Sequence, residues 1–206
     1  MAVLALGITL NTKAGLGVSP IISVAYSVSQ IFSLNFGDMT FLLYCLFVAA
    51  QLFLRDKSEL VATLLQIVVS LIFSRLLNLF AFLIPYDSAE HGLLANLGLL
   101  AVAIFLTGLG IAMTVNMRLV PNPGDGIVQA IADKISRGQG FTKNIFDVGC
   151  VCATAAVGFC CTGRIIGIGV GTIAAMIGVG RAVSLVNHFY QDKMLAAAGM
   201  AVQGKA

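Results

Sequence analysis

The sequence predicts an all-α membrane protein made of two similar halves. Of its 206 residues, 59% are hydrophobic and 10% are charged, and the mean hydropathy is +0.99. Soluble domains carry about a quarter charged residues, and a chain of this size cannot enclose so many apolar side chains, so lipid must cover part of its surface. The apolar runs provide about six membrane-spanning helices, at roughly 20 residues per crossing. Helices and breaks follow the same order in both halves.

The first half begins with two short helices and continues with two longer ones. Met1–Asn11 is apolar, and a glycine-rich break over Thr12–Ser19 separates it from Pro20–Ser33. Proline suits the first turn of a helix, where no backbone N–H is needed, and Ser19 is a good N-cap residue. The longer helices are expected at Met39–Leu54 and Leu60–Ile84.

The first helix is expected to be incomplete as a membrane span. From Met1 to Lys13 a helix rises only ~20 Å, which is short of a hydrocarbon core of ~30 Å. We therefore expect that an upstream extension of about ten residues would stabilise the protein in a membrane.

The second half repeats this order after a polar loop. Its break, VPNPGDG over Val120–Gly126, is dense in turn-forming residues, and Asn122 and Pro123 repeat the N-cap and the proline of the first break. The expected helices are Gly92–Met117, Ile127–Ser136, Phe141–Thr162 and Ile165–Asn187. The chain thus divides into a first repeat over 1–85, a second repeat over 92–190 and a polar, loose C-terminal tail over 191–206.

A shift of 103 positions aligns the two halves. The aligned pairs include Gly7 with Gly110, Leu16 with Leu119, Pro20 with Pro123, Ser33 with Ser136 and, after three further positions, Arg75 with Arg181. The order of features carries more weight than these identities. Each half has a first helix, a Gly/Pro break, a short helix, a glycine corner and two long helices.

The basic residues predict the topology. If both short helices enter the membrane and return, the chain has six spans and the halves are inverted. Only Lys13 and Arg164 then face one side, and the basic residues of the other side are Arg55, Lys57, Arg118, Lys134, Arg137, Lys143, Lys193 and Lys205. Because cytoplasmic loops are rich in Lys and Arg, we expect cytoplasmic termini and two half-helices entering from opposite faces, as in many transporters.

The two helix starts are candidate binding elements. A half-helix that begins inside a membrane exposes N–H groups and the positive end of its dipole, which suit an anion or a polar solute. The same residues also fit capped helices at the membrane surface. Both breaks occupy the same place in the two halves, so we include Ser19, Pro20, Asn122 and Pro123 among the substrate-binding candidates.

Four charged residues complete the candidate site. Arg75 and Arg181 lie within spans, where arginine costs at least ~2.5–3.5 kcal/mol and needs a partner or a water-filled cavity unless it snorkels. Asp125 lies at the start of the second half-helix, where the dipole favours an acid. Asp147 follows Lys143 by one helical turn, so it is a partner of that lysine, a partner of an arginine, or a proton site.

The remaining motifs favour packing over chemistry. Gly163, Gly167 and Gly171 have a spacing of four that lets helices approach closely, so we expect them to pack the last span, in the bundle or in a homodimer. The five cysteines lie in apolar runs and behave as small hydrophobic residues. We find no pattern of a metal site, nucleotide site or catalytic triad, and expect no metal, no cofactor and no enzyme. The net charge of +3, spread over scattered residues, argues against nucleic-acid binding.

Four stretches of the chain carry a family resemblance. They are GLGVSPIISVAYSVS, PNPGDGIVQAIA, FDVGCV and GRIIGIGVGTIAAMIGVG. Over almost the whole chain they resemble the bacterial YczE/YyaS/YitT family of small integral membrane proteins. The resemblance implies a multi-pass protein of the bacterial inner membrane and no particular activity. Family members usually have a longer first helix, so the chain departs from them at its start.

These observations favour a transporter or channel for an ion or a small anionic or zwitterionic solute. The alternative is a non-transport accessory or sensor subunit, because a face of small residues also fits a partner protein. An aquaporin-like pore agrees with six spans and the Asn122-Pro123 pair, but the first half has Ser19-Pro20 instead. A polar cavity between the half-helices favours transport, whereas a dry, close-packed centre favours the accessory subunit.

Overall fold

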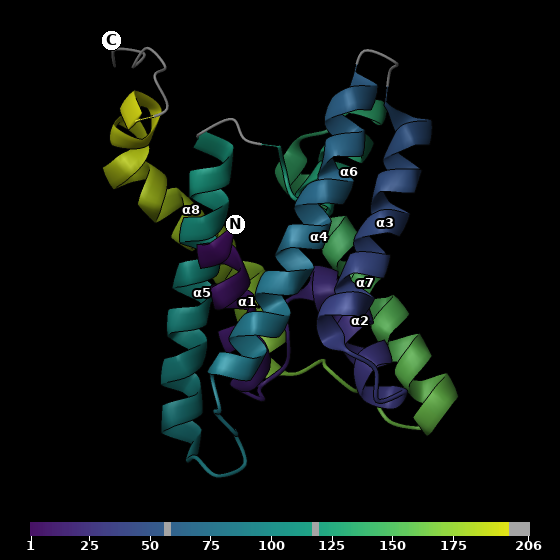
Figure 1. The fold of residues 1–206 in the computed structure, drawn as a ribbon, viewed down its shortest axis with the longest axis vertical. Coiled ribbons are helices and arrows are strands. Elements are labelled where there is room, and N and C mark those ends of the chain that lie inside the picture. Colours follow the sequence, from purple (N-terminus) through teal and green to yellow (C-terminus); the bar gives the residue numbers. More distant parts are fainter. Residues whose placement is uncertain (56–58, 117–119, 198–206) are drawn as a thin grey trace.

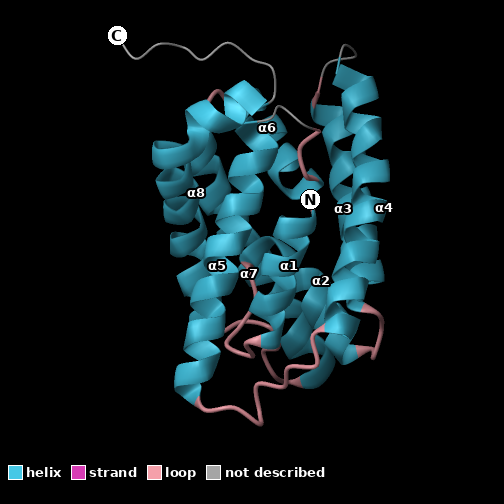
Figure 2. Cartoon of the chain, turned by 60° about the vertical axis from the view of Figure 1, so that its left-hand side comes forward, coloured by secondary structure: helices cyan, strands magenta, loops and turns pink. Residues whose placement is uncertain are grey.

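The structure of the chain, a computed structural model, describes residues 1–55, 59–116 and 120–197. These residues form eight α-helices and no strand (Figures 1 and 2). Five helices, α3, α4, α5, α7 and α8, are long and apolar enough to cross a membrane, and α1, the sixth expected span, has 12 residues. The chain is a helical membrane protein. The helices are α1 Ala2–Lys13, α2 Pro20–Ile31, α3 Phe36–Leu54, α4 Leu60–Leu83, α5 Leu93–Asn116, α6 Pro123–Lys134, α7 Gln139–Thr162 and α8 Val170–Ala197.

Two helix starts differ from the prediction by four residues or more, and those of α3 and α7 differ by two or three. Helix α6 begins at Pro123 rather than Ile127, because Pro123 occupies the first turn and the Asn122 side chain accepts a hydrogen bond from the Gly124 N–H. Helix α8 begins at Val170 rather than Ile165 and continues to Ala197. Of the basic residues used to predict the topology, Lys57, Arg118 and Lys205 lie outside the described residues, as does the side chain of Lys193.

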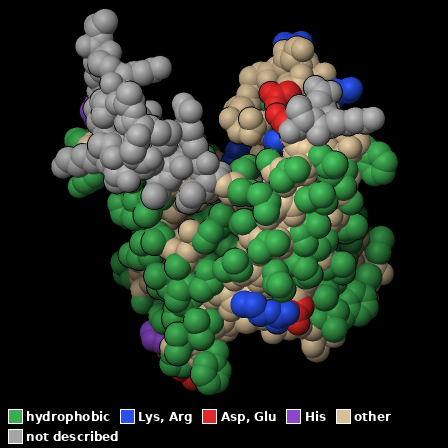
Figure 3. Space-filling view, turned by 45° about the horizontal axis from the view of Figure 1, so that its top comes forward, with side chains coloured by type: hydrophobic (Ala, Val, Ile, Leu, Met, Phe, Trp, Pro, Cys, Tyr) green, Lys and Arg blue, Asp and Glu red, His purple; other side chains and the backbone are tan. Residues whose placement is uncertain are grey.

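Many large apolar side chains face outward, and many polar side chains are buried beside the apolar core. Phe53, Phe82 and Leu94 are each more than four-fifths exposed, and hydrophobic side chains cover most of the face in Figure 3. On α4 a stripe of polar residues, Thr63, Gln66, Ser70 and Ser74, is buried. Such a distribution fits a bundle that is surrounded by lipid and keeps its polar groups inside.

A pair of glutamines ties the polar faces of α3 and α4 together. Gln51 and Gln66 are buried, and each donates from Nε2 to the Oε1 of the other at 3.0 Å. Gly126 of α6 packs on both amides, and a Cβ there would lie 2.7 Å from Gln51 Oε1. The pair therefore forms a joint between α3, α4 and α6.

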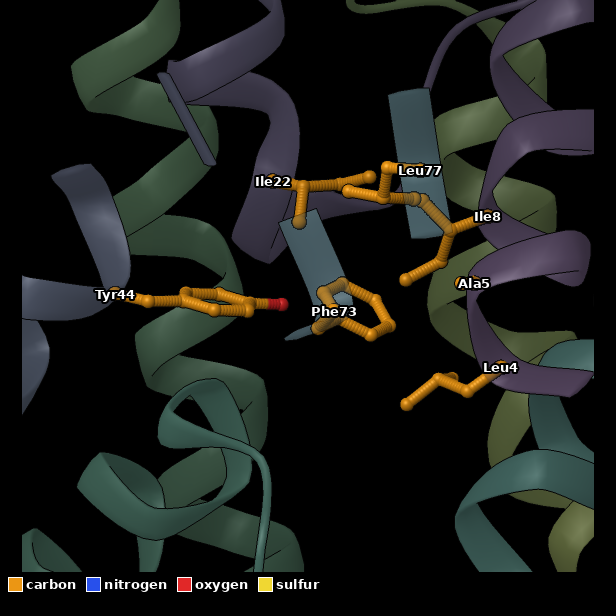
Figure 4. Packing of buried hydrophobic residues seen from close by; sticks show 7 residues of the cluster. All are labelled: Leu4, Ala5, Ile8, Ile22, Tyr44, Phe73 and Leu77. Atoms are coloured by element: carbon orange, nitrogen blue, oxygen red, sulfur yellow. The ribbon is translucent and has the colours of Figure 1, made fainter. Parts of the chain in front are cut away.

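Helices α1 and α5 pack closely through two glycines. A Cβ on Gly7 would lie 2.6 Å from the backbone nitrogen of Thr107, and a Cβ on Gly110 would lie 2.7 Å from the backbone of Leu4. Beside this contact lies the apolar core, in which Leu4 and Ile8 of α1 face Tyr44 and Phe73 (Figure 4). The crossing of α1 and α5 thus lies next to the centre of the bundle.

Corresponding helices of the two halves run in opposite directions. In Figure 1, α1 descends from the N-terminus while α5 ascends, and α3 ascends while α7 descends. The short helices α2 and α6 lie towards opposite ends of the bundle (Figures 1 and 2). Each is 12 residues long, so neither crosses the bundle.

The short helices have the same geometry at both ends. Their N-caps have nearly equal dihedral angles, φ −56° and ψ 139° at Ser19 and φ −60° and ψ 138° at Asn122. Beyond their last turns, Ser33 and Ser136 both have φ 52°, in the left-handed region. Equivalent bonds close these turns, from the Leu34 N–H to the Ser29 carbonyl (2.8 Å) and from the Arg137 N–H to the Ala132 carbonyl (3.1 Å).

The glycines predicted to pack the last span lie mostly before it. Gly163 is the C-cap of α7, and Gly167 lies in the following loop; their φ angles are +68° and +86°. Both angles are in the left-handed region that favours glycine, which explains why these residues leave the helix. Only Gly171 is in α8, and its N–H donates to the Leu16 carbonyl at 2.6 Å. The prediction of a continuous glycine face is therefore wrong.

We expect Gly110→Leu to separate α1 from α5 and to destabilise the protein. The new Cβ meets the Leu4 backbone, which cannot move without its helix, so the cost is about 1–3 kcal/mol or more. Thermal unfolding of the purified protein in detergent measures the effect. Gly98→Leu, on the same helix with no atom within 4 Å of its Cβ position, is the control and leaves the unfolding temperature close to that of the parent. Equal unfolding temperatures of the two variants would contradict this close packing.

Candidate functional site

A pocket lies between the two helix breaks. Its cavity volume is about 50 Å³, room for a few water-sized groups. Of the predicted site residues, Ser19, Pro20, Asn122, Asp125 and Asp147 line it, and Pro123 is buried between two of them. The other lining residues are Leu4, Ile8, Ile21, Ile22, Tyr44, Thr107, Ile111, Gly124, Lys143, Ala175, Met176 and Val179.

Hydrogen bonds hold both helix starts at this pocket. On the first side, the Ser19 N–H donates to Asn11 Oδ1 of α1 at 3.0 Å, and the Ser19 side chain makes no cap hydrogen bond. On the second side, Asn122 Oδ1 accepts from the Gly124 N–H at 3.3 Å, and Tyr44 of α3 lines the pocket beside it. Tyr44 extends from α3 towards the centre of the bundle in Figure 4. The pocket thus presents a serine hydroxyl and the first turns of two helices.

Three charged residues line the pocket. The side chain of Asp147, on α7, is 2% exposed, and its Oδ1 forms an ion pair with Lys143 Nζ at 3.4 Å. Asp125 lies in the first turn of α6, and the charge of Lys143 acts on both carboxylates. With two carboxylates and one ammonium, the lining residues carry a net charge of minus one when ionised. The pocket therefore favours a guest with a positive group.

Twelve of the seventeen lining residues form pairs that are 103 positions apart. These pairs are Leu4 with Thr107, Ile8 with Ile111, Ser19 with Asn122, Ile21 with Gly124, Ile22 with Asp125 and Tyr44 with Asp147. All three charged residues belong to the second half, whereas their counterparts in the first half are uncharged. The pocket thus has one charged wall and one mainly apolar wall.

The two intramembrane arginines are not among the residues that line this pocket, so the prediction that they face it is wrong. Arg75 Nη1 pairs with Asp38 Oδ1 at 3.1 Å, and these side chains are 62% and 48% exposed. Arg181 lines a separate groove on the outside of α8. A position in the middle of a span does not tell which face of the helix the side chain occupies, and both arginines lie on outer faces.

The sequence placed Lys143 among the basic residues of one membrane side and next to Asp147, and did not identify it as a site residue. In the structure it is the basic group of the pocket. One signal was available, because Lys143 and Asp147 share a helix face with Cys150 and Thr154, and the last three are all buried. Among the described residues, no group of three His, Cys, Asp or Glu side chains is placed to hold a metal ion.

We expect Lys143→Met to destabilise the protein more than the double variant Lys143→Met/Asp147→Asn. The single change leaves the buried Asp147 carboxylate without its partner, at a cost of about 1–3 kcal/mol, and the second change removes that charge. Thermal unfolding at neutral pH measures both variants. If the double variant is as unstable as Lys143→Met, the ion pair does not determine the effect.

Comparisons with known proteins place the chain in a family without assigning an activity. No curated protein and no solved structure matches the chain. The model of one family matches residues 1–188, and its description is "Family of unknown function (DUF6198)". Because this match covers most of the 206 residues, the chain belongs to the DUF6198 family.

Proposed function

We propose that the protein is a membrane transporter for a small zwitterionic solute, which binds in the central pocket. One observation carries the proposal: a charged pocket lies at the meeting point of two broken helix starts, one from each half. Binding sites at the interface of repeats, formed by discontinuous helices, are typical of secondary transporters. The pocket between these helix starts supports transport over the accessory-subunit alternative, which a close-packed centre would favour.

We further propose that the halves are inverted repeats, related by a pseudo-two-fold axis in the membrane plane. The contact between α1 and α5 supports this symmetry because it is reciprocal. Gly7 meets Thr107, and Gly110 meets Leu4, and a shift of 103 positions exchanges the two contacts. Reciprocal contacts are the mark of a two-fold relation. The paired lining of the pocket has the same explanation, and the axis would pass through the pocket.

The location in the membrane completes the proposal. An inverted pair of repeats gives α1 the role of a sixth span, with α2 and α6 as half-helices from opposite faces. The excess of basic residues that the sequence predicts on one side of the membrane supports cytoplasmic termini. Membership in the YczE/YyaS/YitT family, and with it an inner-membrane location in bacteria, stays a prediction from the resemblance.

The charges of the pocket favour a zwitterion over a simple anion. The arginines that favoured an anion lie elsewhere, and the pocket has two carboxylates for one lysine. An ammonium group fits between Asp125 and Asp147, where it also balances the net negative charge. A carboxylate fits the Ser19 hydroxyl, which makes no cap hydrogen bond, and the positive dipole end of the helix that begins at Pro20. Both ends of a small amino acid therefore have complementary groups.

We expect small amino acids, beginning with glycine, to raise the unfolding temperature of the purified protein. At a hundredfold excess over the dissociation constant the stabilisation is about 2.7 kcal/mol. Acetate and methylamine, which carry one charge each, should give smaller shifts. Asp125→Asn should remove most of the glycine effect, whereas Asp133→Asn, an exposed carboxylate on the same helix, should keep it. A full shift with acetate, or an unchanged shift in Asp125→Asn, would argue against a zwitterion site.

Uptake of the same amino acid into liposomes that contain the protein separates transport from binding alone. We expect the parent and Asp133→Asn to accumulate labelled amino acid and Asp125→Asn to remain at the level of empty liposomes. Binding without uptake would instead favour the accessory or sensor subunit.

A further inference from the structure

The two halves differ in how closely their last two helices pack against each other. Helices α3 and α4 pack closely, whereas α7 and α8 are not among the closely packed pairs. Between α7 and α8 lies an open groove of about 610 Å³. Its lining residues are Asn144, Met176, Ile177, Gly180, Arg181 and Ser184. The second half thus leaves a space where the first half has a helix contact.

Along α8 the groove changes from polar to apolar. Ala182, beside Arg181, packs against Gly108 of α5, and Gly108 lies eight positions before the end of α5 at Asn116, or about 12 Å along the helix. Asn187 lies at that same end, where it accepts a hydrogen bond from Asn116 at 2.7 Å. Ser184 is therefore nearer to the end of the bundle than Arg181, and Ile177 lies deeper. This order matches that of an amphiphile, with a polar head near the membrane surface and an apolar tail below it.

Arg181 has no acidic partner among the described residues, which distinguishes it from its counterpart. Arg75, the equivalent residue of the first half, pairs with Asp38 at 3.1 Å. The ion pairs of the described residues do not include Arg181. A guanidinium within a span needs a counter-charge or water, and planar N–H donors match phosphate oxygens well.

From these observations we infer that the groove between α7 and α8 binds an anionic phospholipid through its phosphate. Arg181 contacts the phosphate, Asn144 and Ser184 offer further hydrogen bonds, and an acyl chain lies along Ile177. The groove opens on the lateral, apolar side of the bundle, where Ile173 is 62% and Ile145 is 56% exposed. A lipid reaches this surface from the bilayer, whereas a soluble anion must cross apolar surroundings to do so.

The lipid would also complete the wall of the central pocket. Met176 lines both the groove and that pocket, so this side chain lies between them. An acyl chain in the groove covers the outer side of Met176 and keeps water from passing between α7 and α8. The inference concerns the outer surface and does not depend on what the central pocket binds.

The test measures binding of phosphatidylglycerol to the full-length protein in detergent, with phosphatidylcholine as the reference lipid. Native mass spectrometry counts bound lipid, and thermal unfolding reports stabilisation. We expect phosphatidylglycerol to bind the parent more tightly than phosphatidylcholine, and Arg181→Gln to weaken that binding about tenfold. The matched control, Arg75→Gln, removes the equivalent arginine of the first half and should leave phosphatidylglycerol binding unchanged.

A second variant tests the groove without changing any charge. A Cβ on Gly180 has no atom within 4 Å, so Gly180→Leu fills the groove without a clash and should also weaken phosphatidylglycerol binding. Gly98→Leu, at an equally open position on α5, is the control for a new leucine on the outer surface. This variant keeps the inference testable if Arg181→Gln does not fold.

Three results would overturn the inference. The first is equal binding of phosphatidylglycerol by the parent, Arg181→Gln and Gly180→Leu. The second is an equal stabilisation by inorganic phosphate in a lipid-free detergent, which would make the site one for a free anion. The third is a lipid-free dimer that Gly180→Leu dissociates, which would assign the groove to a second copy of the chain.

Discussion

The structure depends on a constraint that lipid imposes on the backbone. Hydrocarbon offers no hydrogen bonds, so every N–H and C=O group of a broken helix at membrane depth needs a partner in the protein or in enclosed water. The break before α2 meets this requirement with the loop before α8 and with the first turn of α8. The Val18 N–H donates to the Gly167 carbonyl at 2.9 Å, and the Gly171 N–H donates to the Leu16 carbonyl. At such contacts two backbones must lie side by side, which is why glycine occupies both segments.

This constraint explains which parts of the molecule the sequence could predict. Long apolar runs predict spans because lipid demands them, and Pro20 and Pro123 mark helix starts because the first helical turn tolerates proline. The repeat predicted that the breaks at Ser19 and at Asn122–Asp125 face one pocket, whereas Asp147 was a candidate only through its spacing from Lys143. The glycines before α8 were misassigned, because a spacing of four fits a helix face as well as a loop with left-handed residues.

The faces of the helices were harder to predict than their ends. An arginine in the middle of a span can face the centre or the lipid, and its position in the sequence fits both, as Arg75 and Arg181 demonstrate. Lys143 had the opposite outcome, since it is close to the start of α7 and nevertheless lines the pocket. The buried glutamines show which residues would have identified the inward faces of the helices. Gln51 and Gln66 interrupt apolar runs, and an uncharged polar residue in such a run has reason to face inward, where it finds a partner.

The glutamine joint has a consequence for the stiffness of the bundle. The two amides bond to each other in both directions, and Gln51 Nε2 also donates to the Phe47 carbonyl at 3.4 Å, so the joint forms without any ionised group. Its strength is therefore independent of pH, of salt and of the voltage across the membrane. The pocket, in contrast, contains the carboxylates of Asp125 and Asp147, which carry charge when they are ionised. The protein thus has an uncharged joint between α3, α4 and α6 in addition to a charged pocket. The joint holds these helices together whatever the charge of the pocket.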